Sequence, residues 1–449
     1  MEVWARKQFS GWGRTARAES PTARPEKRSQ VREALADLRG ESVIPFGAGR
    51  SYGDAALNSA GHAILTRRLD RLLEFDPKTG LLVAESGVSF GELVRLFVPR
   101  GFIPPVVPGT GFATLGGGIA NDVHGKNHHR VGSIGQHLQW FDLCTPTGEM
   151  VRVDASEDTP LLRATLGGIG LTGVIERACI RLARVPSNSV VVRKRRMTNL
   201  DQFLASFAEE EEERSEYVVG WIDALATGGS LGRGILETAS PSAHQMEDRL
   251  RTSRRIPIDF PALVLNPWSV RLFNSLYFHR IPKDGSEEQM PYRKFLFPLD
   301  AIEDWNRIYG RRGFRQFQCV VPRPSGRAAM TALLQRIADA GTGSFLAVIK
   351  ATGEAGRGYL SFAQPGYTLA LDFPNSTVSR RLIESLEDIV IEHGGRTYLA
   401  KDSTLTAVRF RAMYPFADMY SQVLSSIDPE RRMRSDMSQR LGLTAVRNG

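Results

Sequence analysis

Two dense groups of glycines constrain this chain more than any other feature of its sequence. The first spans Gly47–Gly53, and the second lies within Pro108–Gly118, with His124 and Lys126 shortly after it. Glycine adopts positive φ and lets backbone N–H groups approach a ligand closely. Rows of such N–H groups form concave anion sites that suit a pyrophosphate. The two groups together predict a dinucleotide that is held along its length.

A Rossmann site is the obvious candidate, but the sequence fits it poorly. The first group has the spacing G-x-G-x-x-x-G, one residue longer than the fingerprint, and residues 54–65 resemble a loop entering a strand rather than a helix. Asp70 and Asp76 lie near the spacing of the ribose-binding acid, but acids are common. Turns alone could explain either glycine group. They explain less well both groups together with a third, Gly167–Gly173.

The composition is that of a globular protein with room for two or three domains. The chain has 449 residues, of which 42% are hydrophobic and 24% are charged. Its three cysteines, Cys144, Cys179 and Cys319, are widely spaced, match no metal motif and cannot all pair. This pattern indicates a reducing, cytoplasm-like compartment.

Neither a signal peptide nor a membrane span is expected. The first residues, Met1–Lys7, carry charges and no apolar stretch. The longest uncharged stretch, Gly101–Asn121, is interrupted by prolines and glycines and overlaps the second glycine group. We therefore expect a cytoplasmic protein or one that is peripheral at a membrane.

The formal net charge of +9 requires an explanation. No zinc-finger, homeodomain or RNA-recognition signature accompanies it, so we expect no nucleic-acid partner. Basic residues concentrate within Arg6–Arg39 and Asp248–Arg255. An anionic membrane surface or a lipid-phosphate substrate fits this charge better. A soluble protein that is merely basic remains the alternative.

Strands interspersed with helices indicate an α+β fold. Residues 1–30, rich in Arg, Ser and Pro, resemble an arm, and residues 227–298 resemble long loops. Ser89 is a candidate N-cap for a helix that ends near Phe97. A strand over Tyr367–Phe373 would place Thr368, Ala370 and Asp372 on one face.

Longer motifs carry a resemblance to a known family. The glycine-rich segments resemble the FAD-binding domain of the vanillyl-alcohol oxidase and p-cresol methylhydroxylase superfamily: Phe46–Asp54, Pro108–Thr110, Gly116–Ala120 and Gly167–Gly173. Three further segments resemble, more narrowly, the flavoprotein oxidases of the decaprenylphosphoryl-β-D-ribose 2′-epimerases: His124–His129, Ala400–Ser403 and Ser435–Leu441. The matches follow one order and extend over nearly the whole chain.

The resemblance implies a particular domain organisation within the α+β class. Residues 1–184 would form a two-part FAD-binding domain with mixed sheets, to which residues 396–449 return. Residues 185–395 would form a substrate-binding cap domain built on an antiparallel sheet. A composition shift at Val185–Ser189 agrees with that boundary.

The resemblance also implies FAD as the cofactor and marks candidate residues for its binding. These are Phe46, Gly47, Ala48, Gly49, Arg50, Ser51, Tyr52, Gly53, Asp54, Gly109, Thr114, Leu115, Gly116, Gly117, His124, Ile175 and Tyr398. Superfamily members that attach flavin covalently often use a histidine in the first glycine loop. Tyr52 occupies that place here, and a phenol cannot form the histidyl bond. We therefore expect non-covalent FAD.

Lys401, His124 and Tyr52 are the candidate catalytic residues that the resemblance implies. A desolvated lysine loses pKa and can accept a proton near neutral pH. Lys401 could instead stay charged and bind the substrate. His124 would lie beside the flavin ring, although a core histidine is the alternative. His124 and His128 could form an i, i+4 metal pair on a helix, but the intervening Gly125–Asn127 favours a loop, so we expect no metal.

For the sugar-phosphate side, the resemblance marks Lys126, Trp221, Gln316, Gln318, Lys350, Thr368 and Ala370. Two lysines suit a lipid-linked phosphate. The family pattern Asn-x-Cys-x-Asp-Phe-Pro reads Thr368–Pro374 here, with Ala370 in the cysteine position. If the function is shared, that thiol is not needed for chemistry.

The activity implied is FAD-dependent oxidation of the 2′-hydroxyl of polyprenylphosphoryl-β-D-ribose to a 2-keto sugar. A separate NADH-dependent reductase would then complete epimerisation to the arabinose form used in cell-wall arabinan. An aldonolactone or alditol oxidase would share the flavin loops but lack a lipid-phosphate pocket. A catalytically silent flavin-binding scaffold is the third possibility. Flavin bleaching by a panel of sugars and lipid-linked sugars separates the three.

Overall fold

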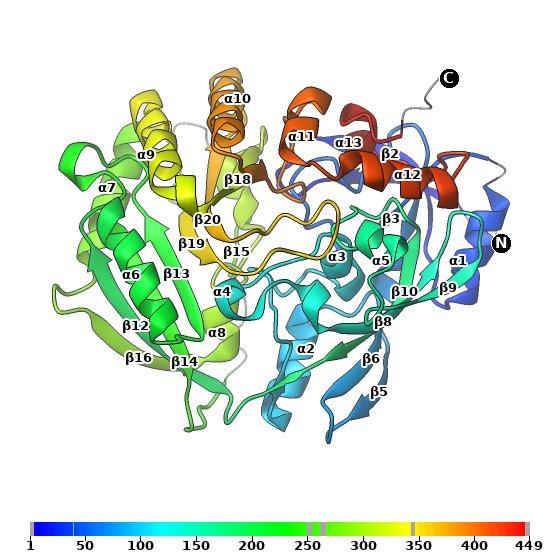
Figure 1. Cartoon of the computed structure of the whole chain (residues 1–449), viewed down its shortest axis with the longest axis horizontal. Coiled ribbons are helices and arrows are strands. Elements are labelled where there is room, and N and C mark those ends of the chain that lie inside the picture. Colours follow the sequence, from blue (N-terminus) through cyan, green and yellow to red (C-terminus); the bar gives the residue numbers. More distant parts are fainter. Residues whose placement is uncertain (1–3, 39, 249–253, 261–265, 343–345, 445–449) are drawn as a thin grey trace.

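The computed structural model describes residues 4–38, 40–248, 254–260, 266–342 and 346–444. It has two halves, one built on smaller sheets near the chain termini and one on a single large sheet (Figure 1). Strands and helices from both halves confirm the predicted α+β class. No helix among the described residues is long and apolar enough to cross a bilayer.

The first half holds two main sheets. A mixed four-stranded sheet has the order β1-β2-β4-β3 and contains β1 (Ala5–Ser10), β2 (Arg17–Ala23), β4 (His62–Leu65) and β3 (Val43–Phe46). An antiparallel five-stranded sheet contains β5 (Leu72–Asp76), β6 (Leu81–Glu85), β10 (Val174–Arg181), β8 (Leu138–Cys144) and β9 (Met150–Asp154), in that order. Two short strands, β7 (Phe102–Ile103) and β11 (Ala183–Arg184), pair beside them.

Short helices connect these strands. They are α1 (Ser29–Asp37), α2 (Phe90–Phe97), α3 (Leu115–Ala120), α4 (His128–Val131) and α5 (Pro160–Thr165). The predicted cap of α2 is confirmed, because the Ser89 side chain accepts from the Glu92 N–H at 3.2 Å while Glu92 accepts from the Ser89 N–H at 3.1 Å. This reciprocal pair satisfies backbone donors that a helix start leaves open.

The second half is an antiparallel eight-stranded sheet. Its order is β16 (Ser286–Pro291), β12 (Ser189–Met197), β14 (Gly234–Pro241), β13 (Tyr217–Ile222), β19 (Ala347–Thr352), β20 (Gly366–Pro374), β18 (Phe314–Pro322) and β21 (Arg396–Thr397). Three helices pack together on one face: α6 (Leu200–Glu212), α9 (Arg323–Ala340) and α10 (Thr377–Glu392). This half also contains α7 (Pro267–His279), α8 (Tyr292–Leu296) and the pair β15 (Arg254–Arg255) and β17 (Ile302–Glu303).

Alternation along the central strands divides the sheet into an apolar face and a face toward the first half. Ile349, Leu369 and Leu371 are buried in the core beneath the helices. Their neighbours along the strands, Lys350 and Ala370, line a cavity on the opposite face. The period of two in a strand thus decides which side chains can reach a ligand.

The C-terminal segment returns to the first half through α11 (Ala407–Met413), α12 (Ala417–Ile427) and α13 (Asp436–Arg440). Met433 forms a bridge with Val43, and the Arg440 guanidinium donates to both oxygens of Asp54 at 2.6 and 3.0 Å. Arg396 and Thr397, at the start of the predicted returning segment, still belong to the large sheet as β21.

Two sequence expectations are wrong. Within residues 1–30, residues 5–23 form the β1–β2 hairpin rather than an arm, because pairing in register from Ala5–Thr22 to Ser10–Arg17 satisfies their backbone groups. Residues 227–298 include β14, α7 and β16 rather than long loops alone. The period of α7 is hard to recognise in the sequence because few of its side chains are buried.

Candidate functional site

A cavity of about 660 Å³ lies where the two halves meet, a volume typical of small-molecule and cofactor sites. The structure brings most of the predicted cofactor residues to its wall. These are Gly47, Ala48, Gly49, Arg50, Ser51, Tyr52, Gly109, Thr114, Gly116, Gly117, His124, Ile175 and Tyr398. The glycine groups form one side and the central strands of the large sheet form the other.

Four predicted cofactor residues lie behind this wall. Phe46 packs on Phe9, and Leu115 is buried in the core of the first half. Asp54 pairs with Arg440, and a Cβ on Gly53 would lie 2.0 Å from the Asp402 carbonyl oxygen. Phe46 and Leu115 thus pack inside the first half, and Gly53 and Asp54 pack against the returning segment.

Two of the glycines at the wall pack closely against neighbouring segments of the protein. A Cβ on Gly116 would lie 2.7 Å from the Ser86 Cβ, and one on Gly47 would lie 2.7 Å from the Thr114 Oγ1. Gly49 has φ of 64°, a conformation that other residues adopt at a cost. Packing within the protein therefore excludes side chains at Gly47 and Gly116, and the contact of these loops with a dinucleotide stays a prediction.

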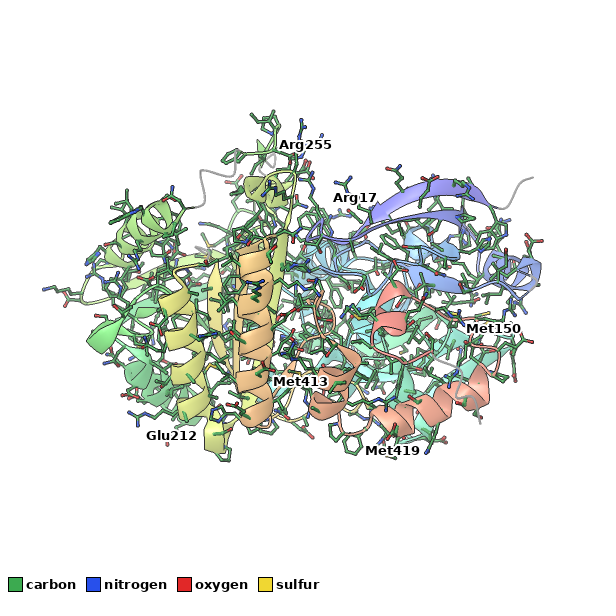
Figure 2. All side chains as sticks on the ribbon, turned by 90° about the horizontal axis from the view of Figure 1, so that it is seen from above. Arg17, Met150, Glu212, Arg255, Met413 and Met419 are labelled. Carbon is green, nitrogen blue, oxygen red and sulfur yellow. The ribbon has the colours of Figure 1, made fainter. Side chains whose placement is uncertain are left out.

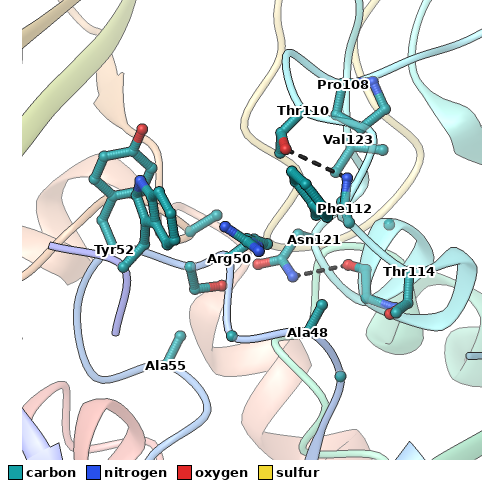
Figure 3. A pocket seen from close by; sticks show the side chains of 18 of the residues that line it. Ala48, Arg50, Tyr52, Ala55, Pro108, Thr110, Phe112, Thr114, Asn121 and Val123 are labelled. Carbon is teal, nitrogen blue, oxygen red and sulfur yellow. Dashed lines mark hydrogen bonds between the residues drawn. The ribbon is translucent and has the colours of Figure 1, made fainter. Parts of the chain in front are cut away.

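Arg50 projects across the cavity in Figure 3, between aromatic side chains from two segments. Its guanidinium carbon is 4.2 Å from the Trp12 ring centroid and 4.4 Å from that of Phe112. Its buried Nε has no hydrogen-bond partner among the described residues. Desolvation lowers the pKa of this guanidinium, and a negatively charged ligand would restore part of the lost solvation.

His124 is buried at the wall with one ring nitrogen committed and the other open. The Gln318 Nε2 donates to His124 Nε2 at 3.0 Å, which makes Nε2 the acceptor and leaves Nδ1 with the hydrogen. Burial lowers the pKa of His124 well below its usual range, and Lys350 lowers it further, so the ring is neutral. Nδ1 has no partner in the described part of the chain. His124 is therefore a neutral side chain at the cavity wall with one buried donor unpaired, and its place beside a flavin ring stays a prediction.

His128 does not join His124 in a helical metal pair. Helix α4 begins at His128, so His124 lies outside it, and the ring centroids are 6.0 Å apart and nearly perpendicular. The His128 Nε2 bonds the Ser133 hydroxyl at 3.3 Å, and its Nδ1 accepts from the Gly353 N–H at 3.2 Å. The described residues contain no group of three or more metal-ligating side chains.

Lys401 and Tyr52 meet at the cavity wall. The Lys401 Nζ lies 3.8 Å from the centroid of the Tyr52 ring, and the Tyr52 N–H donates to the Ala400 carbonyl at 2.8 Å. Desolvation lowers the pKa of Lys401 to about 7, with Lys350 also lowering it and Asp372 opposing. A lysine near neutrality in this place can gain or lose a proton at physiological pH.

Asp372 belongs to this cluster, although sequence reasoning did not select it. It is fully buried, and it accepts from the Gln316 Nε2 at 2.6 Å and from the Tyr309 hydroxyl at 3.3 Å. Desolvation raises its pKa to about 7, while Gln316 and Lys401 act in the opposite direction. The predicted strand alternation placed Asp372 on the same face as Ala370, and this pattern could have identified it as a site residue.

Four of the seven predicted substrate residues line the cavity: Gln316, Gln318, Lys350 and Ala370. Ala370 lies directly opposite Gln318 and Val348 in the strand register. The Lys350 Nζ is 3.4 Å from the Gly125 carbonyl oxygen, and desolvation lowers its pKa to about 8.

Three predicted substrate residues lie away from the cavity wall. The Thr368 hydroxyl supports Gln318 by accepting from its Nε2 at 3.4 Å. The Lys126 Nζ donates to the Phe295 carbonyl at 2.6 Å and lies 4.0 Å from that ring centroid, so its charge is turned toward α8. Trp221 packs against Tyr277 with ring centroids 4.6 Å apart. Lys126 and Trp221 therefore do not line this cavity, and a role for them on the sugar-phosphate side stays a prediction.

Several lining residues were not selected from the sequence. Asn121 lies at the wall with its Nδ2 donating to the Gly117 carbonyl at 2.8 Å (Figure 3). Ile169 lines the cavity at φ of 50°, a strained conformation for a β-branched residue. The third glycine group, with Gly170 and Gly173 at the wall, was a signal for this region. Residues 299–305 gave no comparable signal.

Comparison with known proteins places these features in a family. Residues 20–154 match an FAD binding domain, and residues 312–441 match the D-arabinono-1,4-lactone oxidase family. Decaprenylphosphoryl-beta-D-ribose oxidase of Mycolicibacterium smegmatis is 35% identical to the chain, over 97% of this chain and 98% of that protein. The chain belongs to the decaprenylphosphoryl-β-D-ribose oxidase family.

Two further relatives match the chain at lower identity. An uncharacterised protein in the mprA 5′ region of Streptomyces coelicolor is 30% identical over 79% of this chain and 100% of that protein. L-gulonolactone oxidase 3 of Arabidopsis thaliana is 27% identical over 38% of this chain and 30% of that protein. Membership of the oxidase family and the matched FAD domain make the chain an FAD-dependent oxidoreductase, as its motifs predicted.

Proposed function

We propose that the protein oxidises the 2′-hydroxyl of a polyprenylphosphoryl-β-D-ribose to the 2-keto sugar. The proposal rests on the 35% identity, over 97% of this chain, to an oxidase that is named for such a substrate. The cavity agrees with it, because two amines line it, Lys350 on β19 and Lys401 in the turn after β21, together with the neutral hydrogen-bonding groups of Gln316 and Gln318.

The oxidation breaks two bonds at carbon 2′ and its oxygen. A hydride leaves the carbon, a proton leaves the hydroxyl, and a carbonyl group forms. FAD, when bound, supplies the hydride acceptor. We propose Lys401, as the free amine, as the group that takes the proton, because desolvation brings its pKa to about 7. The Tyr52 ring face, 3.8 Å from the Lys401 Nζ, would stabilise the ammonium once the proton is taken.

Lys350 suits a different role. Its pKa of about 8 leaves it mostly protonated at neutral pH, so it would bind the anionic phosphate of the sugar. Gln318 and Gln316 stand between the two lysines in position to bind sugar hydroxyls, and each is held by a neighbour, His124 or Asp372. This division places a base at one end of the sugar and a cation at the other.

The test is anaerobic bleaching of the oxidised flavin absorbance in the purified holoprotein. Farnesylphosphoryl-β-D-ribose should bleach it, and free ribose, ribose 5-phosphate and L-gulonolactone should not. Preferential bleaching by the lactone would favour an aldonolactone oxidase, and no bleaching by any compound would favour a silent flavin-binding scaffold. Lys350→Met should raise KM for the lipid-linked sugar more than it lowers kcat.

The product chemistry implies a partner reaction. A 2-keto sugar becomes the arabinose epimer only if a reductase delivers hydride to the opposite face of carbon 2′. We propose a separate NADH-dependent reductase for this step, with the present protein peripheral at the membrane where a polyprenyl lipid resides. NADH consumption that begins only when both proteins and the lipid-linked ribose are mixed would support this order.

A further inference from the structure

Helix α7 presents large apolar side chains to solvent. Trp268 is 80% exposed, Leu272 63% and Leu276 65%, and their spacing of four residues places them along one face. Single exposed apolar residues are ordinary on a protein surface, but a row of three on one helix marks an interaction surface. We call Trp268, Leu272 and Leu276 the outer row.

The opposite face of α7 fixes the helix to the large sheet. Its buried residues are Val270, Asn274 and Phe278. Phe278 packs with Ile235 of β14, and the Asn274 Nδ2 donates to Asp223 at 2.7 Å. The outer row is therefore held in a set orientation at the outer edge of the second half, away from the chain termini (Figure 1).

The charged side chains of α7 and of Arg280, the residue that follows it, are all basic. At about 3.6 residues per turn, Arg271 and Arg280 fall on opposite sides of the row. Both are exposed, and the Arg280 guanidinium stacks on the Tyr277 ring at 3.7 Å. Pro267–His279 contains no acidic residue. An apolar strip with a terminal tryptophan and flanking arginines has the chemistry of a helix that lies in an anionic lipid interface.

An aromatic strip connects α7 with the cavity. The Phe273 and Tyr277 rings stack with centroids 5.6 Å apart, and Tyr277 packs on Trp221 at 4.6 Å. Trp221 lies directly opposite Val348 in the sheet register, and Val348 lines the cavity. Trp221 and Ile235 pair on the same face of the sheet, so α7 and the cavity lie on that face together.

We propose that the outer row of α7 docks on an anionic lipid bilayer and that the strip Phe273, Tyr277 and Trp221 guides the apolar chain of the substrate from the bilayer to the cavity. The proposal rests on the proposed function, since only a lipid-linked sugar needs such a route. Docking on a protein would not require arginines on both sides of the row or continuity with the cavity.

The test compares Leu272→Glu/Leu276→Glu with the matched control Val378→Glu/Val408→Glu. Val378 is 62% exposed on α10, which covers the other face of the large sheet, and Val408 is 80% exposed on α11 in the returning segment. Full-length holoprotein is sedimented with phosphatidylcholine vesicles with and without phosphatidylglycerol. Wild-type and control proteins should bind the anionic vesicles. The α7 variant should bind at least about tenfold more weakly, because two apolar contacts become like-charge repulsions.

Flavin content and melting temperature show whether each variant is folded. A second readout is the ratio of turnover for a vesicle-embedded long-chain substrate to that for a water-soluble short-chain analogue, which should fall only in the α7 variant. The proposal is overturned if wild-type protein does not bind anionic vesicles, or if the α7 variant binds them as tightly as wild type. A wild-type dimer that the α7 substitutions dissociate also overturns it, because the row then covers a second copy. Absence of turnover with either substrate, while vesicle binding persists, counts against the proposed function instead.

Discussion

Lys401 and Asp372 form a pair of oppositely shifted groups, the arrangement that tunes acid–base chemistry near pH 7. A base must be deprotonated, so kcat/KM should rise with pH and level off above the pKa of Lys401, near 7. Asp372 raises the Lys401 pKa through its charge. Asp372→Asn should therefore shift the rise of kcat/KM to lower pH, while flavin binding persists.

Substitution of Lys401 separates its two possible roles. Lys401→Ala should keep FAD and lose about 10²–10⁴-fold in turnover, the usual effect of removing a proton-transfer group. Lys401→Arg keeps the cation but cannot release its proton, and it should be comparably slow. An active arginine variant would make Lys401 a binding cation, and loss of flavin from the alanine variant would make it a cofactor ligand. Stopped-flow flavin reduction with the lipid-linked ribose measures both.

Ala370 gives a third prediction at the scale of one residue. It lines the cavity where the family pattern has a cysteine, so an electrophile formed in the cavity from a nitroaromatic compound finds no thiolate there. Intact-mass analysis after turnover should show no adduct on the wild-type protein and one adduct on Ala370→Cys. An adduct on the wild-type chain would place the reactive nucleophile elsewhere, and none on the variant would remove residue 370 from the reacting region.

At the scale of elements, the sequence predicted what depends on local pattern. Strand alternation placed Ala370 and Asp372 on one face, and glycine spacing located the loops at the cavity. The sequence could not predict side-chain contacts between residues that lie far apart in the chain. Lys126 turns to Phe295, far along the chain, and Asp372 acquires Tyr309 only through the fold. The β1–β2 hairpin was missed for the same reason, because pairing outweighs a composition rich in turn formers.

The start of α3 offers a test of the glycine loops as elements. Gly116 donates to the Ser86 carbonyl at 2.8 Å, and its added Cβ would lie 2.7 Å from the Ser86 Cβ. Gly116→Ala should therefore shift this turn, cost about 1–3 kcal/mol in unfolding free energy and weaken FAD binding. Gly229→Ala, with nothing within 4 Å of its Cβ, is the control. Calorimetry and flavin titration of the two variants decide whether backbone proximity matters here.

At the scale of the whole molecule, Arg440 joins three segments of the chain. It pairs with Asp54 in the first glycine loop and with Asp402 beside Lys401, and both partners raise its pKa. Arg440→Gln leaves the buried Asp402 carboxylate without its cation, which should cost about 3 kcal/mol and loosen flavin binding. Arg327→Gln breaks an exposed pair with Asp201 and should cost less than about 1 kcal/mol. Equal losses in urea unfolding would show that the Arg440 junction is no more important than a surface pair.

The same architecture decides how the flavin is retained. The cavity is walled by both halves and by the returning segment, so enclosure can hold the cofactor without a covalent bond. Tyr52 occupies the loop position of the linking histidine, and its ring already contacts Lys401. Acid should unfold the protein around the cavity and precipitate it. All the yellow FAD should then stay in the supernatant, and the polypeptide should have its unmodified mass. Tyr52→Phe should behave alike, because the hydroxyl makes no bond to the flavin. Colour that stays with the precipitated chain would establish a covalent link, with His124 as the first site to map by peptide mass analysis.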